Sequence, residues 1–263
     1  MSLQDNKSKN ILNYESFLVG RSRLSAALME LLPNANYLEK NDLSKLINNK
    51  DHYLPENSII FYTSAVTDPS LDTNLINKVN YLTPITLHQC ISSQSKLITF
   101  GTVLERLYPN LNSYVISKNC LNEYSKKFQN FLHFQLHTLY GIGKPKSHMF
   151  LGQIYDSIKN KKKLRMTSGM QYREYQNINL VANEILNRIF IEDTEKLITF
   201  GLQVRLKDIA KNIFNHFQLN DLLEITENID SSEIYDERIF QKNTKVSHPD
   251  VFKDLNLYLE REL

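Results

Sequence analysis

Short runs rich in β-branched and aromatic residues alternate with longer segments of helical periodicity in the first half of this chain. Such alternation is typical of an α/β fold, because the connection between two parallel strands is usually a helix. The periodicity predicts strands at residues 16–19, 36–39, 58–62, 96–100 and 131–136. It predicts helices at residues 22–32, 42–49, 72–92 with a break at Pro84, and 113–130. A doubly wound parallel sheet is the expected result.

The pattern loosens in the second half. A helix is expected at residues 148–160, a strand at 164–166, and helices at 179–190 and around 205–217. We therefore predict one domain over residues 1–145 and a smaller lobe over residues 146–263 that is partly interleaved with the sheet. The hexapeptide KLITFG occurs at residues 96–101 and 196–201, but the flanking sequences differ, so we interpret the two copies as buried strands rather than as a duplication.

Charge and hydropathy exclude several classes of partner. The 263 residues include 31 basic and 29 acidic ones, for a net charge of +2, which gives no general electrostatic reason to bind nucleic acid or a membrane surface. The basic run KNKKKLR at residues 159–165 is interpreted as a solvated helix end. No run of about eighteen apolar residues occurs. The expectation is a soluble, cytoplasmic protein.

Two cysteines, Cys90 and Cys120, both lie in segments of apolar periodicity. A pair of thiols in such positions indicates a reducing compartment and predicts buried free thiols rather than a disulfide.

Tyr114 and Lys118 lie in the predicted helix at residues 113–130, within the stretch SYVISKNCLNEY. Residues four apart share one face of a helix. An ammonium beside a phenol favours the phenolate and lowers the pKa of the tyrosine, so Tyr114 could serve as a general acid or base. The same spacing also occurs on ordinary surface helices, and the surrounding sequence decides between these interpretations.

Three further motifs accompany YVISK: SAVTDPS at residues 64–70, LYGIG at 139–143 and SGMQYRE at 168–174. With these motifs, residues 16 to 215 resemble the extended short-chain dehydrogenase/reductase family, in its NAD-dependent epimerase/dehydratase branch. The resemblance implies a Rossmann-like sheet with a smaller C-terminal substrate lobe. It also implies an NAD(P) cofactor and a nucleotide-sugar substrate.

The resemblance assigns a role to each matching residue. Tyr114 would pass a proton to or from the sugar, and Lys118 would bind the nicotinamide ribose and lower the pKa of Tyr114. Arg173 would bind the diphosphate of the substrate, a role that suits the paired donors of a guanidinium. The remaining substrate-binding residues implied are Thr138, Tyr140 and Gln171.

One catalytic position departs from the family pattern. The Ser or Thr that should hydrogen-bond the reacting oxygen falls at Phe100 in the segment LITFGTVLE. Thr99 and Thr102 flank that position, and a shift of the chain by one residue or a bulge would bring either hydroxyl into place. We favour Thr102.

The cofactor loop GRSRLSA departs further from the family pattern. Of its three expected glycine positions, the first holds Gly20, whereas the second and third hold Arg23 and Ala26. Two interpretations stay open: Arg21 and Arg23 bind phosphate in place of glycine backbone, or the loop has lost its cofactor. We favour retained binding, because Tyr114 and Lys118 have little purpose without a nicotinamide. The other cofactor-binding residues implied are Leu24, Ser64 and Ala65.

Glu39 and Lys40 point to different cofactors. An acidic side chain at the end of the second strand suits the ribose hydroxyls of NAD, whereas the neighbouring lysine suits the extra phosphate of NADP. The cofactor is therefore left as NAD(P).

The most specific function indicated is reduction of an NDP-4-keto-6-deoxy sugar in surface-polysaccharide biosynthesis. The segment TFGTV lacks the Asp-Glu pair of the dehydratases. An epimerase of the same family and a non-catalytic relative that binds nucleotide sugars stay as alternatives. The resemblance also implies a homodimer formed by the helices at residues 72–92 and 113–130. His133, His137 and His148 are interpreted as structural or substrate-facing rather than as a metal site.

Overall fold

The computed structural model describes residues 13–48, 54–227 and 237–263 of the chain. The chain forms two compact units. The first comprises Met1–Leu136 and Val181–Ile198, and the second comprises His137–Leu180 and Thr199–Leu263. The chain therefore crosses between the units three times, so neither unit is continuous in sequence.

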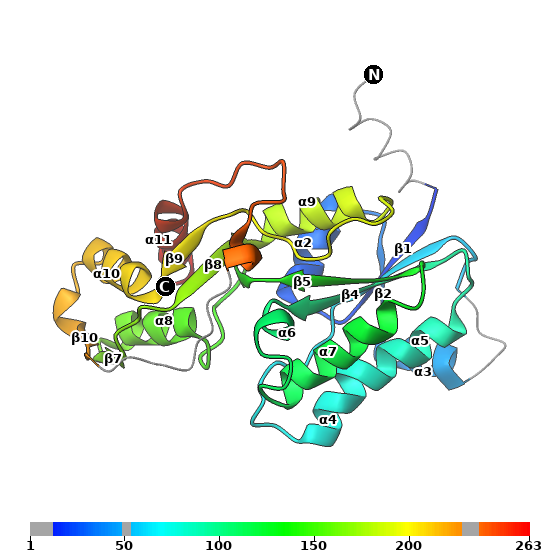
Figure 1. Ribbon diagram of the computed structural model, residues 1–263, viewed down its shortest axis with the longest axis horizontal. Helices are drawn as coiled ribbons and strands as arrows, with labels where there is room; N and C mark the ends of the chain where they lie inside the picture. The colour runs from blue at the N-terminus through cyan, green and yellow to red at the C-terminus, as the bar shows by residue number, and fades with distance from the viewer. Residues whose placement is uncertain (1–12, 49–53, 228–236) are drawn as a thin grey trace. The chain divides into compact units, whose positions relative to one another are not determined.

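A five-stranded sheet forms the centre of the first unit (Figure 1). Its strands are β1 (Glu15–Val19), β2 (Asn36–Leu38), β3 (Ser58–Tyr62), β4 (Lys96–Thr102) and β5 (Phe131–Leu136). Their order is β2-β1-β3-β4-β5, and every neighbouring pair is parallel. The strand order reverses between β1 and β3, which is where open α/β sheets bind ligands. The predicted α/β fold with a doubly wound parallel sheet is confirmed.

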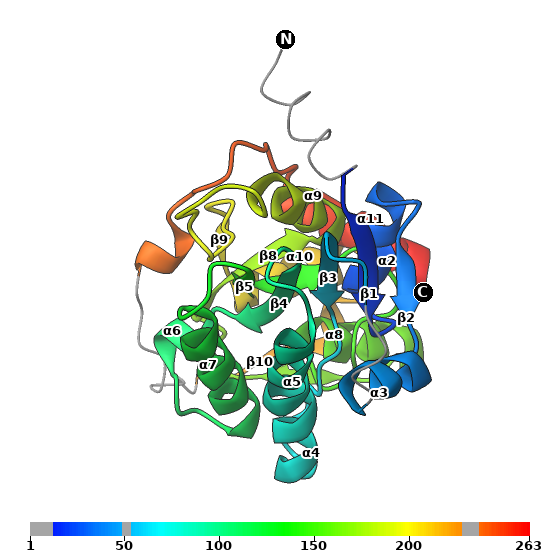
Figure 2. The same cartoon turned by 90° about the vertical axis from the view of Figure 1, so that its right-hand side faces the viewer.

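Helices cover both faces of this sheet, as Figure 1 shows. The helices are α2 (Arg23–Leu31) and α9 (Ile178–Arg188) on one face, and α3 (Lys40–Asn48), α5 (Thr83–Cys90) and α7 (Ser113–Ser125) on the other. The second set contributes Leu46, Leu87 and Leu121 to a core built on the strands. A short helix, α6 (Leu104–Leu107), follows β4 directly. Figure 2 shows α5 and α7 side by side along one face.

The helix expected at residues 72–92 differs from its prediction. It consists of α4 (Thr73–Asn77), a π-helical turn at Lys78–Leu82, and α5, without the break expected at Pro84. Pro84 follows the wider π turn, which accommodates its ring, and the Val79 carbonyl in that turn accepts from the Tyr62 hydroxyl at 2.7 Å. The helix predicted at residues 113–130 also ends early, at Ser125, because the chain turns before β5.

The two KLITFG segments differ in structure. The first forms most of β4, as predicted. The second is buried at Leu197 and Ile198 but forms only one bridge, between Leu197 and Gln135, so the second predicted strand is wrong. Regular pairing stops there because the chain passes into the second unit after Ile198.

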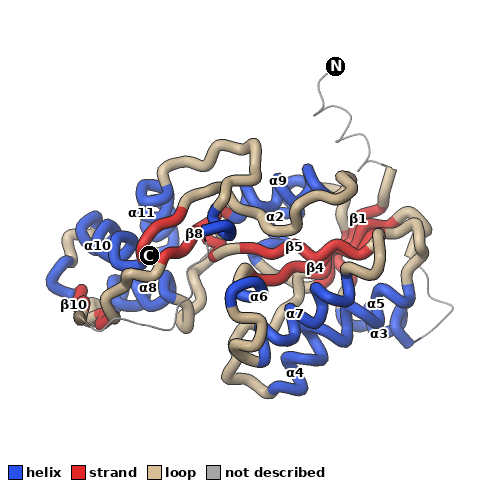
Figure 3. Tube along the Cα trace, viewed as in Figure 1, coloured by secondary structure: helices blue, strands red, loops and turns tan. Residues whose placement is uncertain are grey.

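The second unit combines short strands with three longer helices (Figure 3). One sheet has the order β6-β8-β9, and β7 pairs with β10. These strands are β6 (Thr138–Tyr140), β7 (Leu164–Met166), β8 (Tyr172–Asn177), β9 (Gln203–Arg205) and β10 (Leu223–Ile225). The helices are α8 (Phe150–Asn160), α10 (Leu206–His216) and α11 (Val251–Glu262), with short 3-10 turns at Asn220–Leu222 and Glu237–Phe240. Side chains of all three helices meet in one core. Helix α11 was not predicted.

The cysteines are more accessible than predicted. Cys90 is half-buried and Cys120 is exposed. The prediction of two buried thiols is wrong because α7 buries the face that carries Val115 and Leu121, which turns Cys120 and Ile116 outward. No helix among the described residues has both the length and the apolar character needed to cross a lipid bilayer.

Candidate functional site

A left-handed turn at Gly20 opens the loop after β1. Gly20 has φ of +94°, and a Cβ atom there would overlap the Ser64 hydroxyl and lie 2.9 Å from the Ser64 backbone nitrogen. The amides of Thr63 and Ser64 donate to the Val19 carbonyl at 2.9 and 3.0 Å, which fixes the ends of β1 and β3 together. Glycine is therefore required at this position for both backbone conformation and space. Gly20, the first of the three expected glycines, is thus required by its positive φ and by the nearby Ser64.

Helix α2 starts directly after this turn. Ser22 caps it, accepting from the Ser25 amide at 3.1 Å, while Ser25 Oγ accepts from the Ser22 amide at 2.8 Å. The next two amides, those of Arg23 and Leu24, have no acceptor among the described residues. Free amides at a helix N-terminus favour an anion. The Leu24 side chain is buried in the core, so only its amide is available to a ligand.

Arg21 and Glu39 form an ion pair at the end of β2. The Arg21 guanidinium also lies 4.4 Å from the centre of the Tyr37 ring. Both charged side chains are more than half exposed, at 69% and 56%, so the pair contributes little to stability and either partner is free to exchange. Lys40, the first residue of α3, is exposed beside them. Three of the predicted cofactor residues therefore meet at one strand end.

Tyr114 and Lys118 lie one turn apart on α7, as predicted. Asn112 caps this helix by accepting from the Val115 amide at 3.0 Å. Lys118 is only 2% exposed, and the described residues offer no hydrogen-bond or ion-pair partner to its ammonium or to the Tyr114 hydroxyl. Burial lowers the pKa of Lys118 to about 8, against the opposing effect of the Glu105 charge. A lysine that is mostly buried and has no ion pair among the described residues is a candidate to bind a ligand.

The pKa of Tyr114 moves in the direction opposite to the one expected. Burial raises it, and the negative charge of Glu105 raises it further. The expectation that Lys118 lowers the Tyr114 pKa is thus wrong for this structure, because burial and a buried carboxylate dominate. Tyr114 is therefore a phenol at neutral pH.

Asn80 joins α7 to the loop after β3. Its Nδ2 donates to the Val66 carbonyl at 2.9 Å and to Ser117 Oγ at 3.3 Å, and its Oδ1 accepts from the Val66 amide at 2.9 Å. Asn80 is fully buried in the π turn. This holds the loop with Ser64 and its neighbour Ala65 against the helix of the Tyr–Lys pair. Sequence reasoning missed Asn80, although a polar residue within an apolar helical segment was a usable signal.

The two threonines near Phe100 have different environments. Thr99 is fully buried, and its Oγ1 lies 2.8 Å from His133 Nδ1 within the sheet. Thr102 is the last residue of β4, half-buried, and its Oγ1 accepts from the Leu104 amide at 3.3 Å. A hydroxyl at the carboxyl end of a parallel strand is placed for ligand contact. Thr102 is thus the more accessible of the two hydroxyls, and its catalytic role stays a prediction.

The predicted substrate residues belong to the second unit. Thr138 on β6 pairs with Tyr175 on β8, and Arg173 lies on β8 two residues after Gln171. The Gln171 Oε1 atom is buried and has no hydrogen-bond partner, so it can accept a bond from a ligand.

Tyr140 is 1% exposed, and its hydroxyl donates to Asp254 at 2.6 Å. These contacts make Tyr140 part of the core of the second unit, so its hydroxyl is not available to a substrate in this structure.

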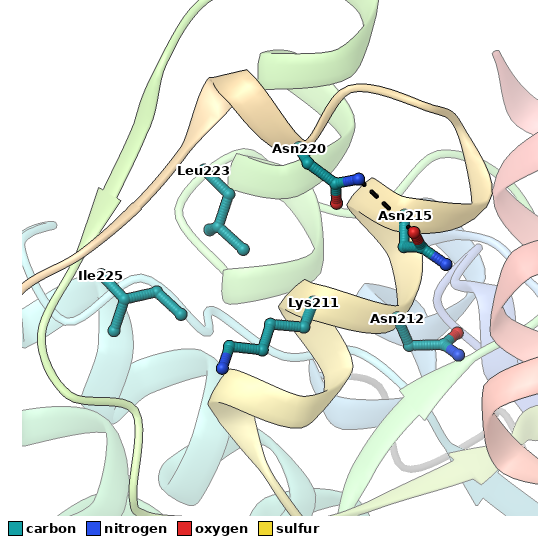
Figure 4. Close-up of a pocket in the computed structure, with 6 residues that line it drawn as sticks. All are labelled: Lys211, Asn212, Asn215, Asn220, Leu223 and Ile225. Atoms are coloured by element: carbon teal, nitrogen blue, oxygen red, sulfur yellow. Dashed lines mark hydrogen bonds between the residues drawn. The ribbon is translucent and has the colours of Figure 1, made fainter.

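A separate hollow of about 660 Å³ lies in the second unit (Figure 4). Its lining residues are Lys211, Asn212, Asn215, Asn220, Leu223 and Ile225, from α10, the 3-10 turn at Asn220–Leu222 and β10. It contains none of the predicted site residues. The described part of the chain also holds no group of three or more His, Cys, Asp or Glu side chains arranged for a metal ion.

No family model matches the chain, and no curated protein sequence matches it. Solved structures do resemble it. The enzyme WbmH of Bordetella bronchiseptica, in complex with NAD⁺, has a TM-score of 0.72 at 16% identity, over 94% of this chain and 97% of that one. A UDP-N-acetylglucosamine 4-epimerase from Methanobrevibacter ruminantium M1, in complex with UDP-N-acetylmuramic acid, has a TM-score of 0.72 at 12% identity, over 94% and 97%.

A third similar structure is RMD from Pseudomonas aeruginosa, complexed with NADPH. Its TM-score is 0.66 at 13% identity, over 94% of this chain and 98% of that one. At such low identity these likenesses establish the fold and leave the reaction open. The chain thus has, over nearly its whole length, the Rossmann-like fold that these nucleotide-sugar and NAD(P)-bound proteins share.

Proposed function

We propose that this protein is an NAD(P)-dependent oxidoreductase that acts on a nucleotide-linked sugar. The observation that carries the proposal is Lys118, a residue that is 2% exposed and whose ammonium has no hydrogen bond or ion pair among the described residues, one helical turn from Tyr114. Burying an unpaired charge is unfavourable unless a ligand completes it. The ribose hydroxyls of a nicotinamide nucleotide would do so.

The residues of the first unit fit such a cofactor. Gly20 allows the tight turn against Ser64 that leads into α2, and the free amides of Arg23 and Leu24 suit a pyrophosphate. Arg21 and Glu39 lie where an adenosine ribose would be held, with Lys40 beside them, and Ser64 and Ala65 follow β3. When bound, the nicotinamide supplies or accepts the hydride.

The protein groups would handle the proton. Tyr114, a phenol at neutral pH, donates its proton to the carbonyl oxygen as that oxygen becomes a hydroxyl. Thr102 donates a hydrogen bond to the same oxygen, and Lys118 orients the ribose. Ketone reduction needs a phenol at the start, whereas an epimerase also needs the phenolate. The segment TFGTV lacks the Asp-Glu pair of the dehydratases, so we favour a reductase, with an NDP-4-keto-6-deoxy sugar as the preferred substrate class and surface-polysaccharide biosynthesis as the process.

Residues of the second unit would bind the substrate. Arg173 suits a diphosphate, because a guanidinium donates two parallel hydrogen bonds. Gln171 offers an unused acceptor, and Thr138 lies on the neighbouring strand. These residues form the proposed nucleotide-sugar set.

A homodimer through α4, the π turn and α7 is part of the proposal. Leu75, Leu82 and Ile116 on these elements are 45%, 48% and 43% exposed. Apolar side chains gathered on neighbouring helices favour association with a like surface.

The test is single-turnover reduction of a panel of NDP-4-keto-6-deoxy sugars with NADPH and NADH deuterated at C4 of the nicotinamide. Deuterium in the sugar product supports the proposal, and Tyr114→Phe should reduce the rate by about 10²-fold or more. If the protein binds cofactor but transfers no deuterium to any keto sugar while it interconverts two NDP-sugars, it is an epimerase and the reductase assignment is wrong.

A second candidate is a non-catalytic protein that binds nucleotide sugars. Two observations favour it: Arg23 begins α2 where the fold usually has glycine, and Arg21 already engages Glu39. This candidate predicts that neither NADH nor NADPH binds, while a nucleotide diphosphate still does.

A further inference from the structure

The carboxylate of Glu105 is buried beneath the strand end that carries Thr102. Its side chain has no exposed surface, and it lies on α6, directly after β4. Its Oε1 accepts from the Thr102 amide at 2.6 Å, and its Oε2 accepts from Gln135 Nε2 at 3.1 Å and faces His133 Nε2 at 3.2 Å. Sequence reasoning assigned no role to this residue.

The Thr102 and Gln135 contacts of Glu105 are N–H donors, and His133 Nε2 faces the same carboxylate. The Gln135 Oε1 atom already accepts from Arg106 Nε at 2.5 Å, and Arg106 also pairs with Glu195 at 2.6 Å. The two N–H donors therefore favour the carboxylate form of Glu105. Burial alone raises the pKa of Glu105, but the charge and hydrogen bond of His133 and the two amide donors lower it overall.

The space around the carboxylate is also specific. A Cβ atom on Gly101 would overlap both Glu105 Oε1 and His133 Nε2. Position 101 can therefore hold only glycine while the carboxylate stays where it is. The Thr99 hydroxyl faces the other ring nitrogen of His133 at 2.8 Å, so β4, β5 and α6 each contribute to one enclosed polar cluster.

We propose that Glu105, held by His133 and Gln135, is a positioning residue that fixes the backbone of Thr102 and places a buried negative charge on α6, which packs against α7, the helix of Tyr114 and Lys118. The effect of Glu105 on catalysis rests on the proposed function. Its hydrogen bond to Thr102 and its buried charge do not. The charged or titratable groups involved are Glu105 on α6, His133 on β5, and Tyr114 and Lys118 on α7, with Arg106 and Glu195 at the outer end.

A buried negative charge acts on both members of the pair. It holds the ammonium of Lys118 protonated, and it keeps Tyr114 as the phenol. Glu105 thus favours the protonated form of Lys118, which the proposed ribose contact uses. It does not touch the reacting atoms itself, since its oxygens are all occupied within the protein.

Three variants separate charge from position. Glu105→Gln keeps the acceptor for the Thr102 amide and removes the charge. Glu105→Asp keeps the charge but is one methylene too short to reach Thr102. Glu184→Gln is the matched control, because Glu184 is another buried carboxylate of the first unit, paired with Arg188 rather than with the cluster.

The first measurement is the titration midpoint of Lys118, followed by NMR in protein labelled with ¹³C at lysine Cε and assigned with Lys118→Arg. The midpoint should fall by roughly 0.5 to 1 pH unit in Glu105→Gln and stay unchanged in Glu184→Gln. An unchanged midpoint in folded Glu105→Gln would overturn the proposal.

The second measurement is hydrogen exchange at the Thr102 amide, which needs no cofactor. Exchange should be about tenfold faster in Glu105→Asp than in wild type, since the amide loses its acceptor. Equal exchange would overturn the positioning role even if Glu105→Gln fails to fold. A protein that shows both effects but binds no NAD(P) would contradict the proposed function alone.

Discussion

Gly20 and Ser64 are in direct backbone contact, and no side chain larger than hydrogen fits between them. The contact joins the ends of β1 and β3 at the point where the strand order reverses, with the amides of Thr63 and Ser64 bound to the Val19 carbonyl. This single glycine therefore determines the shape of the loop that precedes α2. The remaining loop positions tolerate Arg23 and Ala26, because they lie within the helix rather than at the turn.

Gly20→Ala should destabilise the protein by about 2 to 4 kcal/mol, since it adds steric overlap to an unfavourable positive φ. Urea unfolding measures the change. Gly141→Ala is the matched control, because Gly141 also has positive φ but a Cβ there would meet its nearest atom at 3.4 Å. Equal losses in the two variants would show that overlap with Ser64 has no effect.

Lys118→Met should stabilise the free protein and abolish cofactor binding. Replacing a buried, unpaired ammonium by an apolar side chain removes a desolvation penalty of roughly 1 to 3 kcal/mol. Thermal unfolding and NADH fluorescence give the two readouts. A variant that is less stable than wild type would mean that the ammonium has a protein partner after all.

The same residue predicts a pH dependence of stability. The pKa of Lys118 is lowered to about 8 in the folded protein, while an unfolded lysine titrates near 10.4. Between these values the unfolded chain binds more protons, so the Lys118 contribution to the free energy of unfolding rises as pH increases from about 8 to 10. The difference in stability between Lys118→Met and wild type should shrink over this range in parallel urea titrations, and a constant difference would contradict the lowered pKa.

Glu39→Gln should shift binding toward NADPH. Removing the carboxylate releases Arg21 for a ribose phosphate and removes a repulsive charge, so the ratio of the NADH to the NADPH dissociation constant should rise about tenfold. Arg21→Ala is the reciprocal variant and should weaken NADPH binding more than NADH binding. If neither substitution changes the ratio, the cofactor adenosine does not lie at the end of β2.

Thr102→Val and Thr99→Val should have different effects. Thr102→Val should reduce turnover by about 10²-fold with little loss of stability, because its hydroxyl is proposed to contact the reacting oxygen. Thr99→Val should mainly reduce stability, by about 1 kcal/mol, because its hydroxyl bonds His133 inside the sheet. Rapid-quench kinetics and urea unfolding distinguish them, and the reverse pattern would assign the catalytic hydroxyl to Thr99.

Much of the sheet was predictable because β1, β3, β4 and β5 contain apolar runs. The strands at residues 58–62 and 131–136 match their predicted bounds. Helix α11 was missed although it carried a usable signal, since Val251, Leu255, Tyr258 and Leu259 recur at helical spacing after the Asp250 cap. Its stability comes from packing on distant segments of the second unit.

The site was predictable where its residues are close in sequence. Tyr114 and Lys118 share a helix, so spacing alone places them on one face. The cluster of Glu105, His133 and Gln135 joins α6 to β5 across about thirty residues, and sequence spacing gives no sign of it. The direction of the Tyr114 pKa could not be foreseen for the same reason, since it depends on burial and on a carboxylate brought in by the fold.

The most direct test of the central claim is a fluorescence titration of the purified wild-type protein with NADH and with NADPH, alongside Arg23→Gly and Lys118→Met. Saturable binding by wild type at micromolar concentrations, lost in Lys118→Met, is the predicted result. Absence of binding by wild type together with binding by Arg23→Gly would contradict the account, because it would mean that the arginine at the start of α2 has closed the cofactor site.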